Sequence, residues 1–168
     1  MAVTINGTTG ISLVQDGTIT ATKLASGVGG KILQVVQATS STQTSISSGE
    51  SAVEPAVSIT PSSTSSNILI MHSAGGRGNS APNSIGFAIK RGSTVVWAAG
   101  RYGFQNGSIW APCPFHVHYL DSPSTTSEIT YTPFIHCENS ASLIHNSSDA
   151  AVFSGEATAV TIAMEISG

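Results

Sequence analysis

A chain of 168 residues in which only 9% of the side chains are charged is long enough for one principal domain with a buried core. Its net charge of −3 and its six scattered Lys and Arg residues exclude the dense basic surface of a nucleic-acid-binding protein. No apolar run approaches the roughly 18 residues that a membrane-spanning helix needs, so we expect no membrane insertion. The start of the chain lacks the pattern of a secretory signal, and we expect the product to stay in the cytoplasm or to be assembled there.

The first 30 residues differ in composition from the rest of the chain. Asn6-Gly7 and Asp16-Gly17 are strong turn signals, and apolar residues are too sparse for an independent core. This pattern predicts an extended N-terminal arm over residues 1–30, which must bury its apolar side chains on another surface; the alternative is a disordered leader. The residues expected to make docking or trimer contacts are Ile5, Ile11, Leu13, Ile19 and Leu24.

Residues 31–168 alternate between short apolar strands and turns. The clearest alternation is in 159–166, where Val160, Ile162, Met164 and Ile166 share one face. The spacing predicts about eight to ten strands with turns every 8–12 residues, which is typical of a sandwich or jelly roll. We therefore expect an all-β fold, an antiparallel β-sandwich or jelly-roll-like domain over 31–168 with an extended arm.

Two segments of this domain have the same design, Val57–Met71 and Val117–Tyr131. Each contains an apolar strand, a turn rich in Pro, Ser and Thr, and a second strand. Pro61 and Pro123 fix φ in the turn, and the hydroxyl groups bond the local backbone. We expect the two strands of each segment to pair with each other around the proline.

The other expected elements are two further hairpins and several loops. One hairpin is expected near Ser47–Glu50 and another around Gly92-Ser93. The outer loops, which could face a receptor, are expected at 74–84, 100–108 and 139–150.

His116 and His118 form the sharpest local signal for chemistry. In a strand, residues two apart share a face, so the two imidazoles project together. They could ligate zinc, nickel or iron, with His136 or Glu138 as a third ligand. The simpler alternative is that both lie on the solvent face, and no resident cofactor is expected. The histidines without such spacing, expected to be ordinary strand or loop residues, are His72, His136 and His145.

The sequence offers no pattern that indicates catalysis. Its nine Asp and Glu residues are scattered, and none suggests a paired acid and base. There is no Gly-x-Ser-x-Gly elbow. Gly75–Gly78 lacks the lysine and helix of a phosphate-binding loop and is expected to be a mobile loop. We therefore expect no enzyme activity.

A cluster of aromatic and amide residues is a candidate receptor-facing site. Tyr102, Phe104 and Trp110 lie close in sequence to Gln105 and Asn106. Aromatic rings beside amides could stack on a sugar ring and bond its hydroxyl groups. The alternatives are core filling and trimer contacts.

The two cysteines, Cys113 and Cys137, have no CxxC spacing, which argues against a structural zinc site. In a reducing cytosol we expect both to be free thiols. A disulfide between neighbouring strands is the alternative.

Several ordered motifs carry a family resemblance. They are the runs at 30–37 (GKILQVVQ), 58–70 (SITPSSTSSNILI), 90–94 (KRGST) and 119–123 (YLDSP). Together they resemble a domain common in virion-surface and tail-fibre-like proteins of tailed bacteriophages, from about Gly30 to the C-terminus. Asp16–Ala25 also resembles a short unit of phage fibre stalks and necks, which winds around partner chains in a trimer.

The resemblance implies a non-enzymatic structural protein of a tailed-phage virion, assembled in the host cytoplasm as a homotrimer. The favoured interpretation is a capsid decoration, or cement, protein whose arm docks on the major capsid protein. The alternative is a short tail fibre or receptor-binding tip, joined to a tail adaptor and recognising a host surface glycan.

Overall fold

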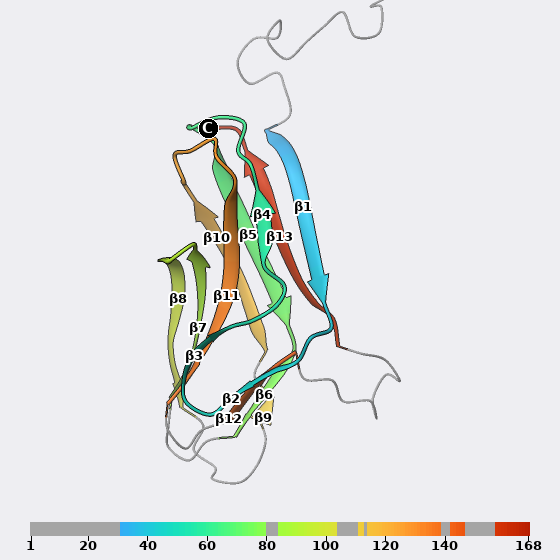
Figure 1. Cartoon of the computed structure of the whole chain (residues 1–168), viewed down its shortest axis with the longest axis vertical. Helices are drawn as coiled ribbons and strands as arrows, with labels where there is room; N and C mark the ends of the chain where they lie inside the picture. The colour runs from blue at the N-terminus through green and yellow to red at the C-terminus, as the bar shows by residue number, and fades with distance from the viewer. Residues whose placement is uncertain (1–30, 80–83, 104–110, 113, 139–141, 147–156) are drawn as a thin grey trace, which may run out of the picture. The chain divides into compact units, whose positions relative to one another are not determined.

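The computed structural model describes residues 31–79, 84–103, 111–112, 114–138, 142–146 and 157–168. Ile32–Gly168 forms one compact unit, and the predicted arm lies outside the described residues (Figure 1). All strand pairs in the described part of the chain are antiparallel, and no helix occurs in it. Those residues therefore contain no helix that could span a membrane. The predicted all-β antiparallel fold class is confirmed.

The strands form three sheets, which we call A, B and C. Sheet A has the order β1-β13-β5-β10, sheet B has β2-β12-β6-β9, and sheet C has β3-β11-β7-β8, with β4 also pairing β11. The strands are β1 (Ile32–Ser40), β2 (Thr44–Ile46), β3 (Gly49–Ala52), β4 (Val57–Ile59), β5 (Asn67–Ala74), β6 (Gly76–Asn79), β7 (Ser84–Arg91), β8 (Thr94–Gly103), β9 (Ala111–Pro112), β10 (Phe115–Asp121), β11 (Ile129–Cys137), β12 (Ser142–His145) and β13 (Ala159–Ile166).

Sheets A and C pack face to face, and their inner side chains make the core. Ile68 and Ile70 of β5 are fully buried, as are Tyr131 and Ile135 of β11. Burying one such aliphatic side chain stabilises the fold by about 1.5–3 kcal/mol. Sheet B lies across one end of the two long sheets (Figure 1).

The two segments of repeated design are not hairpins, and this prediction was wrong. In the first, β4 belongs to sheet C and β5 to sheet A; in the second, β10 belongs to sheet A and β11 to sheet C. Each proline-containing turn therefore crosses the roughly 10 Å between stacked sheets. The two segments pair with each other instead: β4 lies beside β11, and β5 lies beside β10. Crossing lets each segment bury one face of both its strands in the same core.

Three local predictions also need correction. The chain at Ser47–Glu50 turns a corner, because β2 belongs to sheet B and β3 to sheet C. Gly76–Asn79 is strand β6, paired on both sides by β12 and β9, so only Gly75 of the expected loop Gly75–Gly78 lies outside a strand. Strand β8 continues to Gly103, into the expected 100–108 loop.

The hairpin of β7 and β8 is confirmed. Its turn contains Gly92, which has a φ of +58°, a conformation that a residue with a side chain rarely adopts. Glycine at this position explains why the sequence alone located the turn.

Candidate interaction surface

The outer face of sheet A carries large apolar side chains. On β13 the core-facing residues are small or polar and buried: Ala159, Thr161, Ala163 and Glu165. The larger apolar side chains of the same strand point to the opposite side of the sheet and are half-buried: Val160, Ile162, Met164 and Ile166. The prediction that these four share a face is confirmed, and the structure shows that this face is the outer one.

The strand register aligns these side chains with apolar residues of the neighbouring strands. Residues directly opposite in an antiparallel pair lie on the same face of the sheet. The most apolar row across sheet A consists of Val35, Met164, Leu69 and Leu120. The next row consists of Gln37, Ile162, Met71 and His118. The third consists of Thr39, Val160, Ser73 and His116. We call these three rows the apolar sheet face.

The apolar sheet face is exposed and contains no Asp, Glu, Lys or Arg. Val35 is 54% exposed and Leu120 is 50% exposed. Ile32 and Leu33, at the start of the edge strand β1, are 55% and 47% exposed. Long apolar edge strands and contiguous apolar patches are features of surfaces that associate with other chains.

The predicted histidine pair lies at the polar end of this face. His116 and His118 are both exposed on the outer side of β10, as the period of a strand requires. His116 Nδ1 lies 2.9 Å from Ser73 Oγ. His136 is exposed on β11 of sheet C, so the structure does not bring this expected third ligand to the pair. The described residues contain no group of three or more possible metal ligands, and a metal at the pair stays a prediction.

A second pair of histidines is buried, and no spacing in the sequence indicates it. His72 of β5 and His145 of β12 are each 2% exposed, and their Nε2 atoms are 3.2 Å apart. Thr161 Oγ1 donates to the Pro55 carbonyl (2.6 Å) and lies 2.8 Å from His72 Nδ1. The threonine hydroxyl must therefore accept from His72 Nδ1–H, and His72 Nε2 must accept from His145 Nε2–H. This chain of bonds fixes both neutral tautomers.

The buried histidine pair is held neutral. Burial lowers the pKa of His72 to about 3, helped by the positive charges that His145 and His116 would carry. Burial likewise lowers the pKa of His145 to about 4. His145 Nδ1 is buried and has no hydrogen-bond partner among the described residues, so a proton bound there would bring an unpaired charge into the core. Only the tertiary fold brings these residues together, since 73 positions separate them.

Two buried carboxylates link strands within the sandwich. Asp121 Oδ2 accepts hydrogen bonds from Arg91 Nε and Tyr131 Oη, each at 2.7 Å. Burial raises the pKa of Tyr131, and the hydrogen bond to Asp121 raises it further. These bonds join sheet A to sheet C, which is a structural role.

Glu165 is the second buried carboxylate. Its Oε1 accepts from the backbone N–H of Ser62 (2.7 Å) and from Ser62 Oγ (2.6 Å), and its Oε2 accepts from Gln34 Nε2 (2.6 Å). Burial by itself would raise the pKa of Glu165, but the hydrogen bonds from Ser62 and Gln34 outweigh it and lower the pKa to about 2. The carboxylate therefore fastens the end of β13 to β1 and to the turn after β4.

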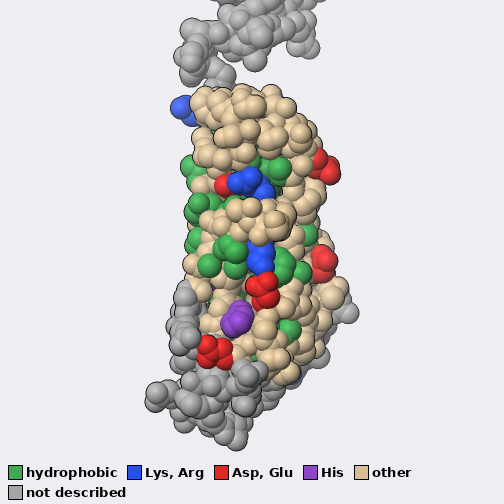
Figure 2. Space-filling model, turned by 60° about the vertical axis from the view of Figure 1, so that its left-hand side comes forward, with side chains coloured by type: hydrophobic (Ala, Val, Ile, Leu, Met, Phe, Trp, Pro, Cys, Tyr) green, Lys and Arg blue, Asp and Glu red, His purple; other side chains and the backbone are tan. Residues whose placement is uncertain are grey.

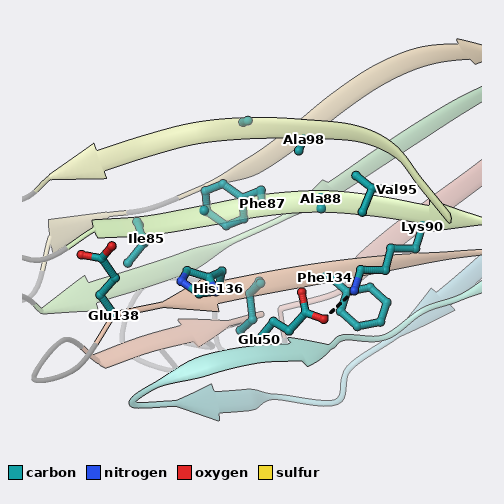
Figure 3. A pocket seen from close by; sticks show the side chains of 13 residues that line it. Glu50, Ile85, Phe87, Ala88, Lys90, Val95, Ala98, Phe134, His136 and Glu138 are labelled. Carbon is teal, nitrogen blue, oxygen red and sulfur yellow. Dashed lines mark hydrogen bonds and ion pairs between the residues drawn. The ribbon is translucent and has the colours of Figure 1, made fainter. Parts of the chain in front are cut away.

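The outer face of sheet C contains a hollow of about 360 Å³. Figure 2 shows one side of the molecule on which a few acidic, basic and histidine side chains lie among apolar patches. Small residues line the floor of the hollow, and Lys90, Phe134 and His136 stand around it (Figure 3).

The other predicted site residues lie in β8 or outside the described residues. Tyr102 lies in β8, opposite Ile85, and not in a loop. The arm residues Ile5, Ile11, Leu13, Ile19 and Leu24 and the candidates Phe104, Gln105, Asn106 and Trp110 lie outside the described residues. Cys113 also lies outside them, while Cys137 is a buried free thiol.

No family model and no curated protein matches this chain. Solved structures of infectious bursal disease virus are similar to it at 14% identity. They include the T=1 particles derived from the virus (TM-score 0.42, 80% of this chain and 36% of that one) and the VP2 subviral particle (TM-score 0.41, 80% and 37%). The Gx strain structure gives a TM-score of 0.42 over 80% of this chain.

The chain spans little more than a third of the length of the chains in these viral structures. A similarity of this size assigns no activity or partner. The sandwich architecture of this chain rests on its own strand pairing and buried core.

Proposed function

We propose that this chain is a non-enzymatic structural protein of a tailed-phage virion, and that it acts as a homotrimeric capsid decoration protein. The observation that carries this proposal is the apolar sheet face. The order of sequence motifs resembling virion-surface domains supports the viral setting, and the low charge of the chain supports a role in assembly.

Leaving an apolar face of this kind in water is unfavourable. Three adjacent rows of sheet A carry Val, Leu, Ile and Met side chains and no Asp, Glu, Lys or Arg. The centres of protein interfaces are depleted of charge and rich in apolar side chains, and a stable interface buries about 800 Å² on each partner. In a trimer, the uncharged faces of three copies could cover one another around the threefold axis without repulsion between like charges.

The arm provides the contact with the rest of the virion. Residues 1–30 join the sandwich at β1, whose first residues Ile32 and Leu33 are exposed. The apolar arm residues are too few to fold by themselves and need another surface. We propose that they bind the major capsid protein or extend across a neighbouring copy.

A short tail fibre or receptor-binding tip is the second candidate. The hollow on the outer face of sheet C favours it, because this side of the sandwich stays open when sheet A is covered. In that case the arm would bind a tail adaptor.

The experiment that tests the proposal is the copy number per virion, measured by quantitative mass spectrometry against the major capsid protein. Hundreds of copies would support a decoration protein. A few to a few dozen copies would overturn that role in favour of the tail fibre. Absence of the chain from purified virions would overturn both.

A further inference from the structure

The hollow on sheet C exists because neighbouring strands carry side chains of very different size. Strand β11 presents two rings to the outer face, His136 and Phe134. Directly opposite in register, β7 presents Gly86 and Ala88. Ala98 of β8 continues the row of small side chains. The rings form one wall, and the small residues form a floor that follows the strands.

The charged groups at one end of the hollow already neutralise each other. Lys90 Nζ donates to Glu50 Oε1 at 2.5 Å and lies 4.1 Å from the centre of the Phe134 ring (Figure 3). The Lys90 side chain is only 13% exposed. A charged ligand would have to compete with this ion pair, in which the Glu50 side chain is 56% exposed, whereas an uncharged ligand would leave it in place.

The polar groups around the hollow mostly accept hydrogen bonds. The carboxylates of Glu50 and Glu138 stand at opposite ends, with the imidazole of His136 between them (Figure 3). The floor between these groups is apolar. The lining therefore suits a ligand with several hydroxyl donors around its rim and one apolar face.

We propose that this hollow binds a neutral polyhydroxylated ring, about one sugar residue in size. Its volume of about 360 Å³ lies in the range of small-ligand sites. The C–H face of the ring packs on Ala88 and Ala98, and its hydroxyl groups bond the carboxylates and His136. This inference rests on the proposed function in one respect: sheet C must stay exposed when other copies cover sheet A.

Filling the floor tests the proposal without breaking the fold. A Cβ on Gly86 would lie 3.6 Å from the Ala99 carbonyl oxygen and 3.7 Å from His136 Cβ, which are ordinary contacts. Valine is favoured in strands, so Ala88→Val is compatible with β7. The control is Ala52→Val, which adds the same two carbon atoms as Ala88→Val to the same face, on exposed β3 opposite Phe134 and outside the hollow.

The experiment is a titration of the full-length protein with single free sugars, followed by two-dimensional NMR. The panel contains neutral hexoses, N-acetylhexosamines and negatively charged sialic acid. We expect a neutral sugar to bind with a Kd of about 1 mM and to shift the amide signals of β7 and of His136. The combined Gly86→Ala and Ala88→Val variant should weaken binding about tenfold or more, and Ala52→Val should leave it unchanged.

Several results would overturn the proposal. One is that no sugar of the panel shifts the amide signals of β7. Another is that sialic acid binds more tightly than the neutral sugars. A third is that the combined Gly86→Ala and Ala88→Val variant, the filled variant, binds as tightly as the native chain. A filled variant that changes the oligomeric state instead would identify the hollow as a contact between copies. If a sugar binds, binding to an array of cell-surface glycans then tests whether the hollow recognises that sugar as the terminal residue of a glycan or only as a free sugar. None of these measurements uses virions. A negative sugar titration therefore contradicts only the ligand proposed for the hollow, whereas the copy-number test addresses the proposed role in the virion.

Discussion

Ser122 Oγ donates a hydrogen bond of 2.5 Å to Asn67 Oδ1, and this bond ties together the two segments of repeated design. Ser122 follows β10, and Asn67 begins β5, its neighbour in sheet A. The turn of each segment therefore lies at the same end of the sandwich as the turn of the other. Their likeness in sequence reflects one shared task, which is to carry the chain from one sheet to the other.

Replacing Tyr131 with Phe should weaken the connection between the sheets. The substitution removes the hydroxyl that donates to buried Asp121 and leaves Arg91 in place. Because this bond has a charged acceptor, we expect the free energy of unfolding to fall by about 1.5–3 kcal/mol, measured by chemical denaturation. Tyr119→Phe is the control, since the Tyr119 hydroxyl makes no hydrogen bond to the described residues. Equal losses in the two variants would contradict the structural role of the Asp121 bond.

The buried histidine pair should make the protein less stable in mild acid. The unfolded chain binds protons near pH 6.5, but folded His72 and His145 bind them only near pH 3 and 4. Between these values the unfolded state holds more protons, so the free energy of unfolding falls as the pH falls. The slope is up to about 1.4 kcal/mol per pH unit for each histidine.

Denaturation at several pH values between 7.5 and 4.5 measures this slope. The variant His145→Gln keeps an N–H near His72 but removes one titrating group, so its slope should be about half that of the native chain. His118→Gln, at an exposed position, is the control. An unchanged slope in His145→Gln would show that other groups cause the acid sensitivity.

Glu165→Gln should loosen β13 at its C-terminal end. The neutral amide retains one acceptor oxygen, but it loses the charge that strengthens the bonds from Ser62 and Gln34. We expect a loss of about 2 kcal/mol in the free energy of unfolding at pH 7. The stabilising effect of Glu165 should also vanish in the native chain as the pH falls from 4.5 towards 2, because the carboxylate is then protonated. Glu128→Gln, at an exposed turn, should leave stability unchanged.

A charge at the centre of the apolar sheet face should disrupt assembly without unfolding the sandwich. Ile162→Lys places an ammonium group among Met71 and Val160 on the outer side of β13. We expect trimers to become monomers in light scattering, while circular dichroism retains its β-sheet signal. Thr94→Lys, on the exposed start of β8 in sheet C, should remain trimeric. A native chain that is monomeric at micromolar concentration would refute the trimer directly.

The sequence alone determined the features that depend on local chemistry. The alternation of 159–166 identified β13, and Gly92 identified the turn between β7 and β8. The two-residue period of a strand placed His116 and His118 on one face. Each of these follows from backbone conformation within a few residues, so no knowledge of distant contacts was needed.

The tertiary structure decided which sheet each strand joins and which face of each strand is buried. A Pro/Ser/Thr turn can either reverse a chain within a sheet or cross to the opposite sheet, and only packing against β11 and β10 places β4 and β5 in different sheets. The same holds for β13, whose alternation defines two faces but not which of them meets sheet C. The His72–His145 pair and the hollow beside Gly86 likewise depend on register between strands far apart in the chain. Long-range pairing sets these features, because a strand has no preferred inside until a second sheet covers it.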